Sequence, residues 1–362
     1  MNLFAQQIKF EDTEGLDLPE GQLITEGDEG ESVAAAVAEV TEEEAGVAED
    51  ERAMDGLVED EETLSEVQDV VEKLNYRPNM TATSLRTGKT RSIGLIVENI
   101  SNQFFAVLAK IIEEEAGKLG YRVFYCSTDN NEERSAELVQ SLLQANVDGF
   151  IITPTEGLEK SVDQLLKMKI PVVLIDRYFP RQNVSHVVMD NYDGAYNATE
   201  FLIEKGRSTI ALINNNSGMI QMQLRENGYV DAMKKAGIYN ESLVLHLDYH
   251  STEEEKVEEL TRFFNANKKI DGVLFLANYL GLAGLQAFHR MGVKIPADLS
   301  VISYDDHYSF KLHSPTITIV EQPINDIAVK AVELLMQQMV NENDFVVEKV
   351  LQKGKLVIRE SV

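Results

Sequence analysis

The chain has 362 residues, enough for two or three domains with a sizeable core. Its single cysteine, Cys126, excludes an internal disulfide framework and suits a cytoplasmic location, and the absence of a signal-like N-terminus argues against secretion. No apolar run approaches the ~18 residues of a membrane span, so we expect no membrane association. The formal net charge is −28, of which residues 1–70 carry −21, with 23 acidic residues against Lys9 and Arg52.

The first 90 residues are predicted to form an acidic head and a linker. Residues 1–62 mix Gly, Glu and Asp with stretches of helix-forming composition, and we expect this head to be mostly helical or disordered. Val67, Val70, Val71 and Leu74 share one face of a predicted helix, which Pro78 ends. Residues 63–90 are therefore assigned as a helix and hinge linker.

From residue 91 onward, strand-like and helix-like segments alternate. The predicted strands are 93–97, 122–126, 149–153, 172–176, 187–189, 210–213, 243–247, 272–277 and 301–304. The predicted helices include 106–119, 134–144, 192–204, 221–235, 253–265 and 280–290. Apolar strands joined by helices indicate parallel sheets covered on both faces. The number of strands predicts an α/β fold with two doubly wound lobes and a ligand site in the crevice between them.

Several segments from residue 63 to the C-terminus occur in an order and spacing typical of a known family. They are LNYRPN at 74–79, SLRTGKTRSIG at 84–94, IGLIVENISNQFF at 93–105, VDGFIIT at 147–153, PVVLIDR at 171–177, MDNYDGAYNATEFLIEKG at 189–206, ISYDD at 302–306, SPTITIVEQP at 314–323 and VIRES at 357–361. Together they closely resemble the lactose-repressor/galactose-repressor (LacI/GalR) family of bacterial transcription regulators. The resemblance implies a periplasmic-binding-protein-like core at 91–362, a dimer, and an effector in the cleft that alters how the core holds a DNA-binding head.

By the same resemblance, the first lobe comprises about 91–190 and 320–341, and the second about 191–319 and 342–362. The resemblance also implies that the linker forms a hinge helix on operator DNA, with Leu85 as a minor-groove wedge and Arg77, Ser84 and Arg86 as further DNA contacts. The alternative is that Leu85 packs under the core.

The head departs from the family pattern. A basic helix-turn-helix is expected there, but the corresponding segment reads AEDERAMDG, and carboxylates repel phosphates. We therefore expect that residues 1–62, which take the place of the helix-turn-helix, do not bind an operator in the family manner. A diverged head, an acidic partner-binding arm and a misread segment all remain open.

Effector-binding residues follow from the resemblance and from their positions at strand ends. In the first lobe they are Phe104, whose ring would stack on the effector, and Asp129, Arg177 and Asp190, whose polar groups would bind it. Core packing for Phe104, helix capping for Asp129 and a turn role for Asp190 are the structural alternatives.

In the second lobe the predicted effector-binding residues are Arg225, Tyr249, Asn278 and Asp305. Tyr279 stands where the family usually has aspartate, which suggests a differently shaped ligand. Carboxylates and amides beside aromatic rings suit a polyhydroxylated ligand, so a sugar is the first expectation and a nucleobase the second.

These features predict a repressor-type, effector-responsive transcription regulator that acts as a homodimer. The alternative is a soluble ligand-binding module that has lost DNA binding and uses its acidic head for a protein partner. No cofactor, metal or enzymatic activity is predicted, because no catalytic or metal-ligating motif accompanies the cleft residues.

Overall fold

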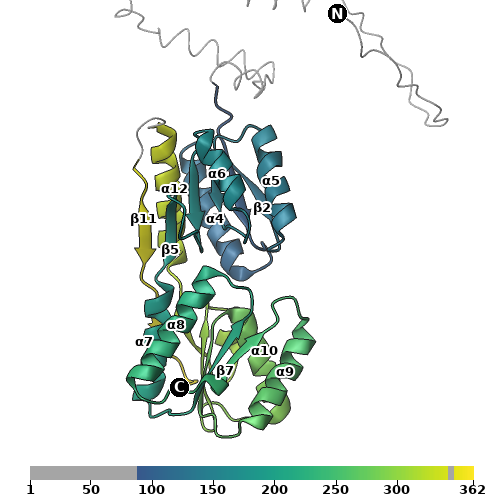
Figure 1. The fold of residues 1–362 in the computed structure, drawn as a ribbon, viewed down its shortest axis with the longest axis vertical. Coiled ribbons are helices and arrows are strands. Elements are labelled where there is room, and N and C mark those ends of the chain that lie inside the picture. Colours follow the sequence, from purple (N-terminus) through teal and green to yellow (C-terminus); the bar gives the residue numbers. More distant parts are fainter. Residues whose placement is uncertain (1–87, 341–345) are drawn as a thin grey trace, which may run out of the picture. The chain divides into compact units, whose positions relative to one another are not determined.

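The computed structural model describes residues 88–340 and 346–362 (Figure 1). The acidic head and most of the linker, including Arg77, Ser84, Leu85 and Arg86, lie outside the described residues. Where the described chain begins, Thr90 is held against the core: its amide donates to Asp148 Oδ1 at 2.9 Å and its hydroxyl to the Asn146 carbonyl at 2.8 Å.

The first lobe is built on a six-stranded parallel sheet of order β11-β5-β4-β3-β1-β2. Its strands are β1 (Ser92–Val97), β2 (Arg122–Ser127), β3 (Gly149–Ile152), β4 (Val172–Ile175), β5 (Ser185–Met189) and β11 (Lys349–Gln352). The four interior strands, β1, β3, β4 and β5, are buried along their whole length. This burial explains why they appear in the sequence as continuous apolar runs.

Helices cover both faces of this sheet. They are α4 (Gln103–Lys118), α5 (Glu132–Gln144), α6 (Glu159–Lys167) and α12 (Ile324–Val340). Because side chains alternate along a strand, Ile93 and Leu95 pack with α4 and α12, whereas Ile96 packs with α5 and α6 on the other face.

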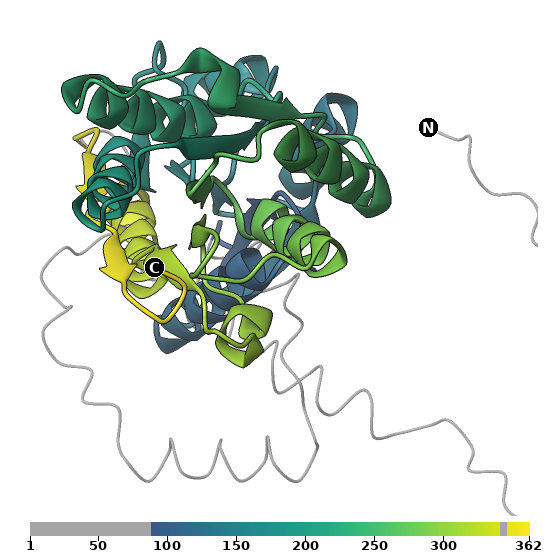
Figure 2. The ribbon, with the colours of Figure 1, turned by 90° about the horizontal axis from the view of Figure 1, so that it is seen from below.

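The second lobe repeats this plan with the order β12-β10-β9-β8-β6-β7, parallel except for the antiparallel β10–β12 pair. Its strands are β6 (Ile210–Asn215), β7 (Val244–Leu247), β8 (Gly272–Phe275), β9 (Ser300–Tyr304), β10 (Thr318–Glu321) and β12 (Lys355–Val357). Its helices are α7 (Asn191–Glu204), α8 (Ile220–Lys235), α9 (Glu253–Ala266), α10 (Asn278–Met291) and α11 (Tyr308–Leu312), with a 3-10 turn at Glu241–Leu243. Seen from below, helices again lie on both sides of the strands (Figure 2).

The chain crosses between the two sheets three times: after β5, between β10 and α12, and between β11 and β12. The assignment of all of 342–362 to the second lobe was wrong in one part. Strand β11 pairs in parallel with β5, from Lys349 opposite His186 to Gln352 opposite Met189, and so extends the first sheet. The physical reason is that α12 packs on the first sheet and returns the chain to its edge.

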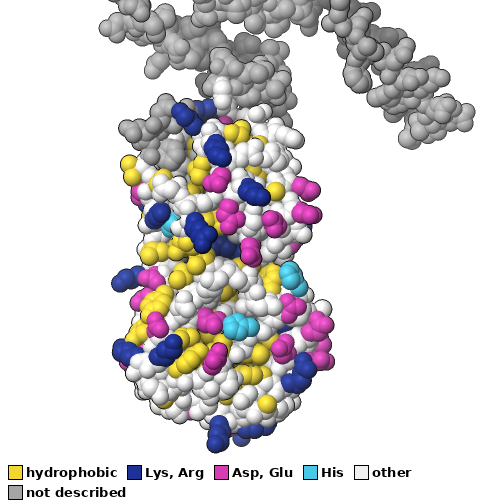
Figure 3. Space-filling model, viewed as in Figure 1, with side chains coloured by type: hydrophobic (Ala, Val, Ile, Leu, Met, Phe, Trp, Pro, Cys, Tyr) yellow, Lys and Arg dark blue, Asp and Glu magenta, His cyan; other side chains and the backbone are white. Residues whose placement is uncertain are grey.

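Within the described residues, no helix is long and apolar enough to cross a membrane. On the face drawn in Figure 3, acidic and basic side chains are interspersed on both lobes. The predicted α/β architecture with two parallel-sheet lobes is confirmed.

Candidate functional site: the cleft between the lobes

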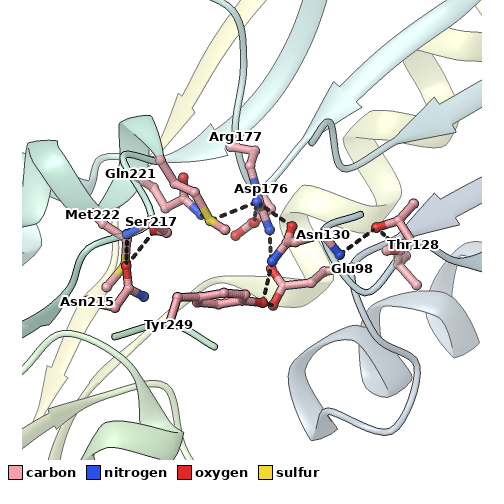
Figure 4. Close-up of polar contacts among 12 residues, drawn as sticks. Glu98, Thr128, Asn130, Asp176, Arg177, Asn215, Ser217, Gln221, Met222 and Tyr249 are labelled. Atoms are coloured by element: carbon pink, nitrogen blue, oxygen red, sulfur yellow. Dashed lines mark hydrogen bonds and ion pairs between the residues drawn. The ribbon is translucent and has the colours of Figure 1, made fainter. Parts of the chain in front are cut away.

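Polar side chains follow three strands of the first sheet and meet at one edge. Glu98 follows β1, Asn130 lies in the turn after β2, and Asp176 and Arg177 follow β4. The carboxyl ends of parallel strands meet at the same edge of a sheet, which is where α/β proteins bind ligands. Figure 4 shows Glu98, Asn130 and Arg177 pointing toward one another there.

Arg177 is the centre of a polar network in the first lobe. Its Nη2 pairs with the Glu98 carboxylate, its Nε lies 3.1 Å from Asp176 Oδ2, and its Nη1 donates to Asn130 Oδ1 at 2.9 Å. The side chain is only 4% exposed. Burial disfavours its charge, but Glu98 and Asp176 outweigh this effect and raise the pKa of Arg177 above its ordinary value.

Arg225, in the second turn of α8, has a different environment. Its Nε donates to Asn191 Oδ1 at 2.7 Å and its Nη1 to the Leu276 carbonyl at 2.6 Å. The guanidinium carbon lies 4.1 Å from the centre of the Tyr304 ring, within range for a cation–π interaction. Buried and anchored by neutral groups, Arg225 lines the cleft without a hydrogen-bonded carboxylate.

Asp305 follows β9, with a left-handed backbone at φ 62°. Its Oδ1 accepts a hydrogen bond from Gln322 Nε2 at 2.6 Å. Burial raises the pKa of Asp305, and the nearby positive charge of Arg225 partly opposes this shift. Asp305 lines the cleft, where its carboxyl oxygens are able to accept hydrogen bonds from a ligand.

Tyr249, in the loop after β7, links the two lobes. Its hydroxyl donates to Glu98 Oε1 at 2.8 Å and accepts from Asn130 Nδ2, so one second-lobe group engages two first-lobe residues (Figure 4). Burial and the Glu98 carboxylate raise the pKa of the Tyr249 hydroxyl above its ordinary value. The hydroxyl therefore stays protonated at neutral pH and acts as a donor.

These side chains enclose a small cavity of about 50 Å³. Its lining comes from both lobes: Glu98, Asn102, Phe104, Phe105, Asp176, Asn215, Met219, Gln221, Met222, Arg225, Tyr249, Ala277, Asn278, Tyr279, Asp305 and Gln322. Ligand pockets usually measure about 300–1,000 Å³, so this cavity is small. A hollow of about 400 Å³ shares Phe104, Asp305 and Gln322 with its lining, and one of about 230 Å³ shares Met219. Among the described residues, no group of three or more His, Cys, Asp or Glu side chains is placed to hold a metal.

Comparison with known proteins decides the family. The chain is 32% identical over 295 residues to the ribose operon repressor of Halalkalibacterium halodurans, a match covering 82% of this chain and 86% of that protein. The chain belongs to the LacI/GalR family of transcription regulators. Residues 199–362 also match the periplasmic binding protein-like domain model. The transcriptional repressor PurR of Pasteurella multocida is 29% identical over 305 residues, covering 83% of this chain and 90% of that protein.

Solved structures of LacI/GalR proteins share the fold. A periplasmic binding protein/LacI transcriptional regulator from Alkaliphilus metalliredigens, complexed with D-xylulofuranose, superposes with a TM-score of 0.66. The two chains are 27% identical, and the match covers 75% of this chain and 98% of the other. The relatives are transcriptional repressors, so this LacI/GalR chain is a regulator and not an enzyme.

Most of the predicted effector-binding residues of this LacI/GalR chain come together. Phe104, Arg225, Tyr249, Asn278 and Asp305 line the cavity, and Arg177 lies behind Glu98 at its edge. Their binding of an effector stays a prediction.

Two predicted residues lie elsewhere. Asp129 is exposed and pairs with Arg134 at 2.7 Å, whereas its neighbour Asn130 faces the cleft. Asp190 accepts from the Asp193 amide at 3.0 Å and caps α7, which is the structural role left open for it.

Sequence reasoning missed Glu98, Gln221 and Gln322 as cleft residues. Glu98 directly follows a buried strand, and this position was a usable signal. Gln221, whose buried Oε1 has no hydrogen-bond partner, carries no such signal because it lies within a helix. Tyr279, which stands where the family usually has aspartate, lines the cavity. Its hydroxyl accepts a hydrogen bond from Asn215 Nδ2 at 2.6 Å, and burial raises the pKa of this hydroxyl to about 12.

Proposed function

We propose that this chain is a repressor whose cleft binds a small sugar and thereby controls how the chain engages operator DNA. The observation that carries the proposal is the meeting, around one cavity, of an aromatic ring, a guanidinium and a carboxylate from different elements: Phe104, Arg225 and Asp305. A sugar ring presents an apolar face that stacks on Phe104 and hydroxyls that donate to Asp305 and accept from Arg225.

Two of the matched proteins support a sugar as the effector. The protein matched at 32% identity is a ribose operon repressor, and the Alkaliphilus structure contains D-xylulofuranose. A five-carbon sugar exceeds the present cavity of about 50 Å³, so its binding requires the lobes or the lining side chains to move. The bonds made by Tyr249 across the cleft are the first contacts that such a movement would break.

Strand β1 connects the cleft to the start of the core, where the linker joins it. Strand β1 ends at Val97, beside the cleft residue Glu98, and begins at Ser92, next to the anchored Thr90. A rigid strand therefore joins the effector site to the point where the linker enters the core. Altered lobe geometry would in this way change the presentation of the linker to DNA.

A homodimer would cover exposed apolar residues around the edge strand β2 of the first lobe. Val107 in α4, Leu119 at its C-terminal end, and Phe124 and Tyr125 on β2 are each at least 40% exposed. An unpaired strand edge with exposed aromatic side chains is a typical association surface. Phe124→Asp should shift the mass measured by sedimentation from dimer to monomer.

The proposal is tested with the full chain. D-ribose and D-xylulose are added over a concentration series in thermal unfolding, and we expect a saturable rise in Tm with at least one sugar. Mobility-shift experiments at low salt, with the DNA upstream of its own gene, should show retardation that the same sugar changes.

Absence of a Tm rise across a wide neutral-sugar and nucleoside panel would overturn the sensing role. Sugar binding without any DNA retardation would instead support a ligand-binding module whose acidic head meets a protein partner.

A further inference from the structure

Three acidic and two basic side chains lie around the cleft. Three are the carboxylates of Glu98, Asp176 and Asp305, and two are the guanidinium groups of Arg177 and Arg225. The three carboxyl groups outnumber the two guanidinium groups by one, although burial raises the pKa of Asp176 and Asp305 and so favours their neutral forms. This balance bears on which effectors the cleft accepts.

The positive charge of Arg177 is neutralised by neighbouring carboxylates of the protein. Asp176 and Glu98 both pair with its guanidinium, and Asn130 takes a further donor. Its side chain is 4% exposed, so water does little to screen these interactions. An anionic effector approaching Arg177 would have to displace a buried carboxylate and leave it without a partner.

The positive charge of Arg225 is opposed by its surroundings. Its field acts on both Asp305 and Asp176, as shown by its lowering of their pKa values against the larger effect of burial. A phosphate placed against Arg225 in so small a cavity would also lie close to Asp305. The cleft thus contains no guanidinium free of carboxylate influence.

From this arrangement we propose that the cleft selects uncharged sugars over sugar phosphates and sugar acids, and that Glu98 is a specificity-determining residue. This inference rests on the proposed sugar-binding function and names the class of sugar. Glu98 acts in two ways: it neutralises Arg177 at the edge of the cavity, and it repels an incoming negative group.

The position of Glu98 is fixed from both lobes. Arg177 holds Oε2 from the first lobe, and the Tyr249 hydroxyl donates to Oε1 at 2.8 Å from the second. When the lobes open and the Tyr249 bond breaks, the ion pair with Arg177 inside the first lobe still holds Glu98 in place. Rejection of a wrong ligand by a fixed like charge is a common source of binding specificity.

The test compares matched ligands by calorimetric titration of the full chain. The pairs are D-ribose with D-ribose 5-phosphate, and D-xylulose with D-xylulose 5-phosphate. In the wild type, we expect the neutral member of a pair to bind at least about a hundredfold more tightly, because juxtaposed like charges are strongly disfavoured in an interface.

Glu98→Gln should narrow this preference by about tenfold or more, since it removes one charge near the ligand and frees Arg177. Glu98→Asp, which keeps the charge, should narrow it much less. Glu204→Gln changes the net charge of the protein equally at an exposed position at the end of α7, away from the cavity lining, and should leave the preference unchanged.

Equal binding of neutral and phosphorylated sugars by the wild type overturns the inference, as does an unchanged preference in folded Glu98→Gln. If Glu98→Gln does not fold, the wild-type comparison of neutral and phosphorylated sugars still tests the selectivity. Failure of every neutral sugar to bind would reject the proposed function itself, and binding of neutral sugars with no effect of Glu98 would reject only this selectivity.

Discussion

The two arginines of the cleft are equally buried but differently bound, and the comparison separates their roles. Arg177, from the first lobe, is held by two carboxylates and an amide. Arg225, from the second lobe, is held by an amide oxygen, a backbone carbonyl and an aromatic ring. The first is paired with carboxylates inside the protein, whereas the second is hydrogen-bonded only to neutral groups and lines the cavity.

This difference shows that burial and position at a strand end do not by themselves define an effector-binding arginine. Whether a buried arginine can bind an effector also depends on whether its guanidinium is already paired with carboxylates of the protein. Arg177 therefore acts mainly to hold Glu98 and Asn130 in place, and Arg225 acts directly on the effector. Substitutions at and around these arginines test whether Arg177 is structural and Arg225 binds the effector.

The largest effect on stability is expected from Arg177→Met. The change leaves the carboxylates of Glu98 and Asp176 without their partner, which typically costs about 3–5 kcal/mol for a buried pair. Chemical denaturation measures the free energy of unfolding. The double variant Arg177→Met with Glu98→Gln should regain part of the loss, because one unpaired charge is removed together with its partner.

Arg290→Met serves as the matched control for Arg177. Arg290 also pairs with a carboxylate, Glu254, but both side chains are about half exposed. Its replacement should change the free energy of unfolding far less. Comparable losses at the two positions would contradict the structural role assigned to Arg177.

A smaller effect is expected from Tyr249→Phe, which removes the hydrogen bonds to Glu98 and from Asn130. These are the bonds across the cleft, so the ligand-free chain should open more readily and scatter X-rays with a larger radius of gyration. The unfolding free energy should fall by roughly 1–3 kcal/mol. Tyr308→Phe, at a position 69% exposed, should have neither effect; an unchanged radius for Tyr249→Phe would count against closure by this residue.

The smallest effect concerns Asp306, which lies beside Asp305 but outside the cavity lining. Arg359 donates to both of its oxygens, at 3.0 and 2.9 Å, and Lys311 lies 2.8 Å from Oδ2. Burial would raise its pKa, but these cations outweigh burial and lower the pKa of Asp306.

A lowered folded-state pKa stabilises the protein above the unfolded-state value of about 3.9, and the stabilisation is lost as pH falls through the folded-state pKa. Asp306→Asn should therefore reduce the unfolding free energy by roughly 1–2 kcal/mol at pH 7 and make little difference near pH 2. Denaturation curves of both proteins at the two pH values measure this. A loss that is equal at pH 7 and pH 2 would rule out the ionic contribution.

Much of the fold was predictable because buried parallel strands are apolar along their whole length. β1, β3 and β8 are examples. Strand β11 was not predicted, because an edge strand with alternating exposed residues resembles a loop in sequence. Helix α12 was also not among the predicted helices, although its buried residues Ile327, Ala331, Leu334 and Gln338 recur at helical spacing on the face that packs against α4 and the first sheet.

The site was predictable at the level of strand ends but not of individual side-chain directions. Asp129 and Asn130 are adjacent and both have a left-handed backbone, at φ 51° and 54°. Only the folded turn decides that Asn130 faces Tyr249 while Asp129 faces Arg134. The neutralisation of Arg177 depends on Glu98, which lies 79 residues away, and no local pattern encodes that contact.

The central claim, that the cleft binds an uncharged sugar through Arg225, is tested most directly by calorimetric titration of wild-type protein and Arg225→Ala with D-ribose and D-xylulose. The account predicts saturable binding to the wild type and a loss of affinity on the order of a hundredfold or more in the variant, because a buried charge-assisted donor to ligand oxygens is removed. The variant must first be shown to unfold cooperatively, since Asn191 and Leu276 also lose a donor. Equal affinity of the two folded proteins for the same sugar would contradict the account.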